Sequence, residues 1–375
     1  MNTLFVIFIL SLLFAYLTER TTIGEYVVSR RQTTQNRFFY ALLLLTLILP
    51  VGLRRIYNDT GAYINGFQEA PTITELFSSG ELHILQNPAF EVYTSLVRTF
   101  TDNYSVYFLI AASFVMISYA ETIRRYVKPF HVGIGLLFCL GTYVFSIAAM
   151  KQTIAMAILL LALPKLLQKK YGQYILIVFI AFLFHTYAIA FLILPLFTQK
   201  PWNWRTIALL MAVFFVMWNF ENVIGSFLDY ANESGKSIAE YEVFDNAQVN
   251  IFRVLVYAVV PVMSLLFRKY LFDNPSNKQY CLFINMAIIS CSIMMLGLMS
   301  GANMFARMAI YFEFGLICSL PWMIKKIFTA KSARFILVIA SICFLVYFMY
   351  ANIIAAPFDY HYRAVSLWDF IISLF

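Results

Sequence analysis

Charged residues are scarce in this chain. Of its 375 residues only 12% are charged, whereas 62% are hydrophobic and 18% are aromatic. A soluble domain carries about 25% charged residues, because its surface must face water. The scarcity excludes a soluble globular enzyme. Together with a mean hydropathy of +0.77, the apolar runs that recur along the whole chain predict a polytopic helical membrane protein.

Cysteines are few, and none stands in a connecting segment. All five lie inside apolar runs: Cys139, Cys281, Cys291, Cys318 and Cys343. This placement excludes a disulfide framework and favours buried, small apolar side chains.

Several motifs that mark particular chemistries are missing. The sequence has no Walker A motif, no GxSxG, no DxD sugar-nucleotide motif and no metal-ligand cluster with suitable spacing. We therefore expect no metal and no cofactor. We also expect no nucleic acid partner. In a membrane protein, a net charge of +8 reflects the concentration of Lys and Arg in cytoplasmic connections.

Eleven apolar runs are candidate membrane spans. They cover residues 4–17, 38–53, 104–120, 133–149, 152–164, 174–197, 206–220, 251–267, 281–299, 302–322 and 335–351. The first run has basic residues only after it and no cleavage signature, so we expect a retained anchor with its N-terminus outside. The runs predict one all-α membrane domain over residues 1–375, a polytopic transmembrane helical bundle of about 10–11 spans.

Charge sorts the connections between these runs into two groups. Six connections hold 19 of the 27 Lys and Arg residues and four acids, and we expect them in the cytoplasm: 18–37, 121–132, 165–173, 198–205, 268–280 and 323–334. The longer connections 54–103 and 221–250 hold twelve of the nineteen acids, so we expect them to be outward-facing loops. Residues 54–103 are patterned enough to predict short helices on the outer surface.

The run 174–197 breaks this alternation, because basic connections flank both of its ends. His185 stands at its midpoint. Either the run is a broken or re-entrant helix near His185, which requires buried or cavity-lining backbone, or one short basic connection lies outside.

Ionisable residues within or at the edge of a membrane are costly, so each is a functional candidate. The first group follows the second run and comprises Arg54, Arg55, Asp59 and Tyr63. Asp59 and Tyr63 are four apart and would share a helical face. Two arginines in a connection expected outside are unusual, because basic residues are expected mainly in cytoplasmic connections. A planar guanidinium can donate two hydrogen bonds to a phosphate. A plain helix end, capped by Asn58 or Asp59, is the alternative.

Three further candidates lie in the middle of the chain. Lys151 and Gln152 follow an apolar stretch with no polar loop, so the ammonium should sit near the outer interface. It either snorkels to water or enters an outward-facing cavity, with Gln152 as a neutral donor. His185 is either a core residue or a group that accepts a hydroxyl proton or donates to phosphate.

The last group lies in the tenth run. Arg307 follows the small-residue stretch MSGANMFA, and Tyr311 stands four residues later, so the pair is expected on one helical face. Glu313 lies elsewhere around that helix and is either functional or paired with another helix. A tyrosine near the outer loops can stack on a sugar.

Five segments resemble the EpsG family of bacterial exopolysaccharide and capsule proteins, which is related in role to the Wzy-type polysaccharide polymerases. The segments are RRIYNDTGAYINGF, NPAFEVYTSLVR, MKQTIAMAILLLA, IAFLFHTYAIAFLILP and FARMAIYFEFGLICSLP. The family usually has arginine where this chain has Lys151, glycine where it has Asn58, and Glu-Gly where Pro88 and Ala89 precede Phe90.

The resemblance implies a polymerase of lipid-linked repeat units for exopolysaccharide, capsule or O-antigen, acting at the outer face of the bacterial cytoplasmic membrane. The donor would be the growing glycan on polyprenyl diphosphate, and a flippase and a chain-length regulator would be partners. Arg55, Lys151 and Arg307 would bind the diphosphate with support from Arg54. Asp59 or His185 would be the base, without a metal.

Two other classes of function fit the same sequence. A transporter or flippase for a lipid-linked sugar would show discontinuous helices at corresponding positions of two halves. A membrane acyltransferase that modifies glycans would need a cytoplasmic acyl-donor site.

Overall fold

The computed structural model divides the chain into two compact units. The first comprises residues Met1–Ile189 and Phe335–Phe375, and the second Ala190–Arg334. The structure describes residues 3–21, 23–27, 30–34, 36–79, 87–220, 248–272, 277–299 and 303–374. Most of the predicted outer loop 221–250 lies outside the described residues, and the single domain over 1–375 stays a prediction.

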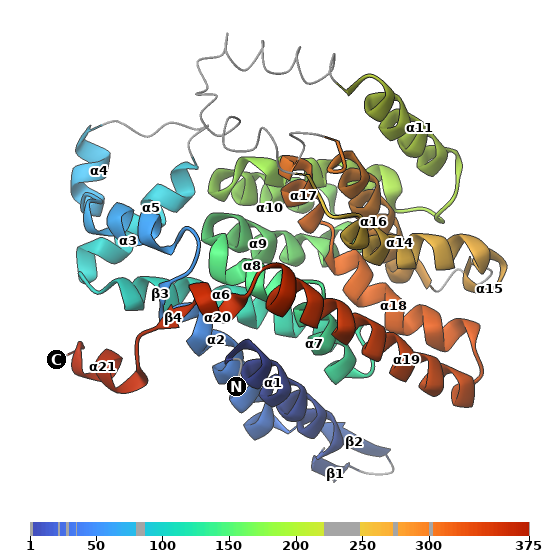
Figure 1. Ribbon diagram of the computed structural model, residues 1–375, viewed down its shortest axis with the longest axis horizontal. Coiled ribbons are helices and arrows are strands. Elements are labelled where there is room, and N and C mark those ends of the chain that lie inside the picture. The colour runs from blue at the N-terminus through green and yellow to red at the C-terminus, as the bar shows by residue number, and fades with distance from the viewer. Residues whose placement is uncertain are drawn as a thin grey trace. The chain divides into compact units, whose positions relative to one another are not determined.

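The first unit is built almost entirely from helices (Figure 1). Its N-terminal part contains α1 (Thr3–Arg20), β1 (Ile23–Val27), β2 (Arg30–Thr34), α2 (Arg37–Gly52), β3 (Arg54–Ile56), α3 (Thr60–Gln68), α4 (Ile73–Ser79) and α5 (Pro88–Phe100). There follow α6 (Tyr104–Tyr126), α7 (Phe130–Cys139), α8 (Thr142–Ala148), α9 (Met150–Leu167) and α10 (Tyr171–Phe184). The C-terminal part adds most of α19 (Ala330–Met349), the π-helical turn η4 (Tyr350–Ala355), α20 (Phe358–His361), β4 (Arg363–Ala364) and α21 (Leu367–Ile372).

The described part of the second unit is helical throughout. It contains most of the 3₁₀ helix η2 (Thr186–Phe197), then α11 (Trp204–Trp218), α14 (Ile251–Leu266), α15 (Arg268–Phe272), α16 (Lys278–Leu296), α17 (Asn303–Ile310) and α18 (Phe314–Ile327). The predicted all-α, multi-pass architecture is therefore confirmed.

Every predicted apolar run contains a helix. Among the described residues, five helices are long and apolar enough to cross a membrane, and two bent pairs raise the number to seven. Five shorter apolar helices, of 10–17 residues, account for the other predicted runs. The predicted count of about 10–11 spans is therefore reached only if these shorter helices also cross. At about 1.5 Å per residue, such helices are shorter than a hydrocarbon layer of about 30 Å.

Asparagine side chains begin four of these helices. The Asn36 side chain accepts a hydrogen bond from the Phe38 amide before α2, and Asn103 does the same for Ser105 before α6. Asn203 caps α11 and Asn250 caps α14 in the same manner. A side-chain oxygen at this position satisfies an amide that the first turn leaves unpaired, so these polar residues set where the apolar helices start.

Two helix pairs are sharply bent. The α7–α8 pair bends by 54° and the α17–α18 pair by 55°. Gly141 allows the first bend, because its φ of 90° is a backbone conformation that favours glycine. Past the second bend, Gly315 lets α18 approach α16, since a Cβ there would lie 2.5 Å from the backbone nitrogen of Ala287.

The run 174–197 is interrupted at the predicted residue. The α10 helix ends at Phe184, His185 has extended backbone with φ −157° and ψ 122°, and the chain continues as η2. The predicted break near His185 is confirmed, whereas the bend after Ile310 has no counterpart in the sequence prediction.

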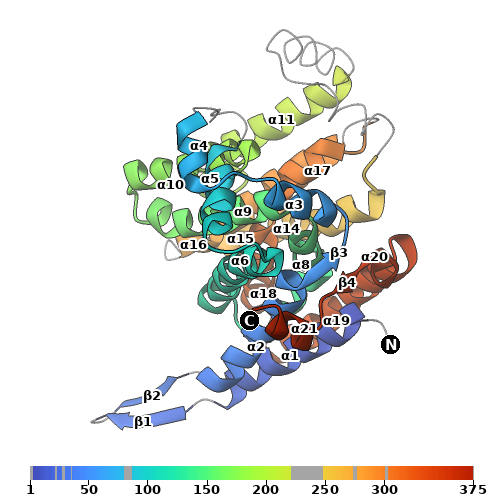
Figure 2. The same ribbon diagram turned by 90° about the vertical axis from the view of Figure 1, so that its left-hand side faces the viewer.

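The region 54–103 forms a small layer of the first unit. As predicted it folds into short helices, and Figures 1 and 2 show α3, α4 and α5 lying together. Its first residues form a strand, because β3 pairs antiparallel with β4 near the C-terminus. The β1–β2 hairpin lies at the ends of α1 and α2 in both views.

The cysteine prediction holds for four of the five residues. All five are free thiols, and four are buried, but Cys343 is exposed. Cys343 lies on α19, where only 22% of the apolar window is buried, so much of this helix faces outward.

Candidate functional site

Arg54 is a buried cation at the centre of the candidate site. Its side chain is 1% exposed. Nη1 donates to the carbonyl of Val51 at 2.6 Å, Nη2 lies 3.6 Å from Met150 Sδ, and the guanidinium stacks over the Phe108 ring at 4.0 Å. The buried Nε has no hydrogen-bond partner in the structure. Arg54 thus joins β3 to the start of α9.

Burial lowers the pKa of Arg54 to about 10, and surrounding tyrosines oppose that shift. The guanidinium consequently keeps its charge at neutral pH. A buried charge without a paired carboxylate is costly, and the stacked Phe108 ring offsets part of that cost.

Aromatic rings surround this cation. Tyr107 stacks on Phe67 at 4.6 Å and on Tyr93 at 5.2 Å, and its hydroxyl lies 3.1 Å from Thr94 Oγ1. These rings come from α3, α5 and α6, so the short helices of region 54–103 supply much of the wall around Arg54.

Lys151 brings a second cation to the same place. It lies in the first turn of α9, directly after Met150, and its ammonium is 4.9 Å from the centre of the Phe90 ring. No side chain caps this helix at Ala149. The first amides of a helix carry a partial positive charge that repels a lysine and attracts an anion. The next residue, Gln152, is buried.

Of the other residues in the first predicted group, Tyr63 lies near Lys151. The ring of Tyr63 lies 6.0 Å from that of Phe90, the ring under the Lys151 ammonium. Asp59 is the N-cap residue of α3, its side chain makes no capping bond, and its carbonyl accepts the Tyr63 amide at 3.1 Å. The predicted helical spacing of Asp59 and Tyr63 is confirmed. Arg55 and Asp59 are both exposed, so Asp59 is not the side-chain cap that was the alternative.

His185 lies at the C-terminal end of α10. Its side chain is half-buried, and its ring meets that of Tyr187 edge-on at 5.2 Å.

Arg307 and Tyr311 belong to the second unit. The prediction that both lie on one helical face is wrong, because α17 ends at Ile310 and the chain turns there before α18. Arg307 is exposed on α17, whereas Tyr311 is buried in the turn.

The same turn buries Glu313, which is 1% exposed. Its Oε1 accepts a hydrogen bond of 2.7 Å from the hydroxyl of Tyr257 on α14. Arg253, one helical turn earlier, lies 5.9 Å from the centre of the Tyr257 ring. Glu313 therefore pairs with another helix through a tyrosine.

The C-terminal segment closes one side of the Arg54 cluster. Tyr362 donates to the carbonyl of Pro50 at 2.8 Å and acts electrostatically on Arg54. The Val365 amide bonds to the carbonyl of Leu53 at 2.7 Å. These contacts could not be predicted from the sequence, because more than 300 residues separate the partners. The sequence indicates Phe90 only as part of the segment NPAFEVYTSLVR, without a role of its own. Among the described residues, no three His, Cys, Asp or Glu side chains form a group that could hold a metal.

The EpsG family model matches residues 37–364. The chain belongs to the EpsG family. Membership makes it a multi-pass membrane protein of a Wzy-like polysaccharide polymerase family, in exopolysaccharide biosynthesis. No curated protein and no solved structure matches the chain. The matched range begins with α2 and ends at Ala364 in β4, so it contains Arg54, Lys151 and the strand pair beside them.

Proposed function

We propose that this EpsG protein polymerises lipid-linked oligosaccharide repeat units at the outer face of the bacterial cytoplasmic membrane. The growing glycan is transferred from polyprenyl diphosphate to the repeat unit most recently delivered. The observation that carries the proposal is the presence of two cations at the start of α9. Arg54 lies against Met150 and the Phe108 ring, and Lys151, the residue after Met150, lies over the Phe90 ring.

The leaving group explains why cations gather at a helix start. When the glycosyl bond breaks, negative charge develops on the departing diphosphate. Lys151 and the first amides of α9 stabilise that charge in a low-dielectric setting. Arg54 is too buried to reach substrate in this structure, so its role is to position Met150 and the turn that carries Lys151.

The exposure of each remaining candidate side chain suggests its role. Arg55 is exposed beside Arg54 and contacts the diphosphate. Arg307 is an exposed cation of the second unit and keeps its expected role as a phosphate-binding residue. Tyr63 offers a ring for a sugar face, Tyr311 supports the turn after α17, and Gln152 supplies a neutral amide at the start of α9.

The transfer itself needs one base. Asp59 takes the proton of the acceptor hydroxyl, whose oxygen attacks the anomeric carbon of the donor. The new glycosidic bond forms as the bond from that carbon to the diphosphate oxygen breaks, and polyprenyl diphosphate leaves as an anion. Asp59 is preferred to His185 because it is exposed one helical turn from Tyr63.

A ladder assay tests the proposal. Purified protein in nanodiscs is incubated with lipid-linked repeat units, and the products are separated by length. Wild-type protein and Lys151→Arg, which restores the usual family residue, should make a ladder, whereas Lys151→Met and Arg307→Ala should not. A normal ladder from Lys151→Met would refute the assigned role, and failure of the wild-type protein to extend the glycan would refute the function.

One observation favours a second candidate, a transporter of lipid-linked sugar. Each unit contains one bent helix pair, with almost equal bends of 54° and 55°, and transporters use discontinuous helices in two halves. Liposomes with fluorescent lipid-linked sugar distinguish the two. Movement between leaflets without a ladder supports the transporter, and a ladder without such movement supports the polymerase.

A further inference from the structure

A groove in the first unit lies apart from the Arg54 cluster. It has a volume of 1170 Å³ and is bordered by α6, α9 and α10. Residues from the connections 121–132 and 165–173, both expected in the cytoplasm, line it together. The groove is therefore expected at the cytoplasmic edge of the membrane, opposite the proposed polymerisation site.

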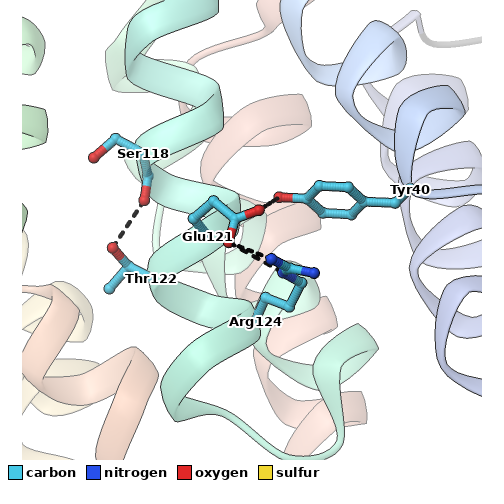
Figure 3. Close-up of polar contacts among 5 residues, drawn as sticks. All are labelled: Tyr40, Ser118, Glu121, Thr122 and Arg124. Atoms are coloured by element: carbon cyan, nitrogen blue, oxygen red, sulfur yellow. Dashed lines mark hydrogen bonds and ion pairs between the residues drawn. The ribbon is translucent and has the colours of Figure 1, made fainter. Parts of the chain in front are cut away.

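The groove has an apolar part. Phe114, Ile117 and Leu161 line it, and these side chains are 40–51% exposed. Ile177 of α10 completes this wall. The hydroxyls of Ser118 and Thr122 are used within the protein: Ser118 donates to the Ala157 carbonyl at 3.0 Å, and Thr122 donates to the Ser118 carbonyl at 2.8 Å (Figure 3). This part therefore suits a hydrocarbon chain.

The other part of the groove is basic. Its lining includes Arg124, Arg125, Lys128 and Lys165, with one acid, Glu121. Basic residues at helix C-termini also complement the helix dipole. Lys128 lies beyond the end of α6, however, so the dipole does not account for all of them.

The acid does not cancel these charges. Glu121 accepts 2.7 Å hydrogen bonds from Tyr40 and from Arg124 Nη2, and Arg124 Nε adds a third at 3.1 Å (Figure 3). The Arg124 guanidinium also lies 5.0 Å from the centre of the Tyr40 ring. Glu121 and Arg124 thus form a neutral pair fixed against α2. Arg125, Lys128 and Lys165 supply the excess positive charge of the lining. Of these, Lys128 also interacts electrostatically with Glu19, which does not line the groove.

We propose that this groove binds an anionic phospholipid of the cytoplasmic leaflet. Arg125, Lys128 and Lys165 contact the phosphate, and an acyl chain lies along Phe114, Ile117 and Leu161. The combination of a basic end with an exposed apolar wall matches a phosphate that carries a hydrocarbon chain, and basic pockets between membrane helices are suited to anionic head groups. The proposal does not depend on the polymerase reaction.

The test measures photo-crosslinking of an anionic lipid. Full-length protein is placed in nanodiscs with a trace of phosphatidylglycerol carrying a photoactivatable acyl chain, and labelled peptides are mapped. The wild-type protein should be labelled on α6 and α9. The triple variant Arg125→Gln, Lys128→Gln, Lys165→Gln should lose labelling by about a hundredfold, since each basic residue near a membrane surface contributes a several-fold increase in binding.

A matched control removes the same charge elsewhere. The variant Lys325→Gln, Lys326→Gln, Lys331→Gln changes three exposed lysines in another connection expected in the cytoplasm, and it should keep wild-type labelling. Leu161→Trp, which fills the apolar wall, should reduce labelling even if the triple variant does not fold. The same probe built on neutral phosphatidylcholine should label the peptides weakly.

Four outcomes would overturn the proposal. Equal labelling by the phosphatidylcholine probe would show a groove without charge selectivity. Displacement of the lipid by inorganic phosphate would identify a site for a free anion, and displacement by polyprenyl diphosphate would identify a substrate entrance. Unchanged labelling in both the folded triple variant and Leu161→Trp would place the lipid elsewhere.

Discussion

Arg54 and Met150 meet across 96 residues of sequence, with Nη2 of the arginine 3.6 Å from the methionine sulfur. Met150 opens α9, and Lys151 is the next residue. The contact therefore ties the residue that begins β3 to the helix start that carries Lys151, the half-buried cation of the proposed site.

Two substitutions of Arg54 can separate the effect of its charge on activity from the effect of its packing on stability. We expect Arg54→Met to remain folded, because an apolar chain can replace a buried charge at little cost in stability. The same variant should fail to extend glycan, since the turn that carries Lys151 loses the guanidinium contacts with Val51 and Met150 that position it. Arg54→Lys should keep partial activity because it keeps the positive charge. It should lower the free energy of unfolding by about 1–2 kcal/mol, because lysine lacks the planar guanidinium that stacks on the ring. The ladder assay and thermal unfolding check both, and wild-type ladders from Arg54→Met would reduce Arg54 to a packing residue.

The positions of the helices could be predicted from the sequence because hydrocarbon imposes long apolar runs. All eleven runs contain a helix, and the break at His185 followed from an inconsistent charge pattern. The bend after Ile310 could not be predicted in this way, because MAIYFEFG is uniformly apolar around one acid. Its cause is tertiary: Glu313 bonds to Tyr257 of α14, and Gly315 contacts α16.

The candidate site was predictable as a set of residues and not as a geometry. Arg54 and Arg55 are adjacent residues of the same type, yet Arg54 is buried and Arg55 is exposed. The difference arises from the β3–β4 pairing and the Phe108 ring, and both are long-range contacts. Long-range contacts of this kind cannot be predicted from local charge or hydropathy.

Asn58 lies where the backbone favours glycine, with a φ of 39°. This conformation explains how the chain departs from the family's usual glycine, because asparagine tolerates left-handed backbone better than most residues. We expect Asn58→Gly to leave stability within about 0.5 kcal/mol and Asn58→Val to lose about 1–2 kcal/mol. Asn65→Val, on the exposed face of α3, is the matched control and should be nearly neutral. Equal unfolding temperatures for Asn58→Val and Asn65→Val would contradict the backbone argument.

The Tyr257 hydroxyl and the Glu313 carboxylate should be energetically coupled. Both side chains are buried, and an intramolecular hydrogen bond contributes about 0.5–1.5 kcal/mol. A double-mutant cycle with Tyr257→Phe and Glu313→Gln, followed by unfolding in mixed micelles, should return a coupling of that size. Tyr270→Phe serves as the control, because Tyr270 is 67% exposed and its loss should cost less than about 0.5 kcal/mol. Additive single effects would show that the bond does not stabilise the bend.

The choice of base can be decided by comparing three conservative variants. Asp59→Asn keeps the shape of the side chain and removes its capacity to take a proton, so glycan extension should slow by about 10²–10⁴-fold while lipid-linked substrate still binds. Glu69→Gln is the matched control, because Glu69 is an exposed acid at the other end of α3, and it should extend glycan normally. His185→Gln should slow extension far less than Asp59→Asn, since His185 does not take the acceptor proton in this assignment. If His185→Gln abolished extension and Asp59→Asn did not, the proton would pass to the histidine, and the break after Phe184 would become part of the reaction site.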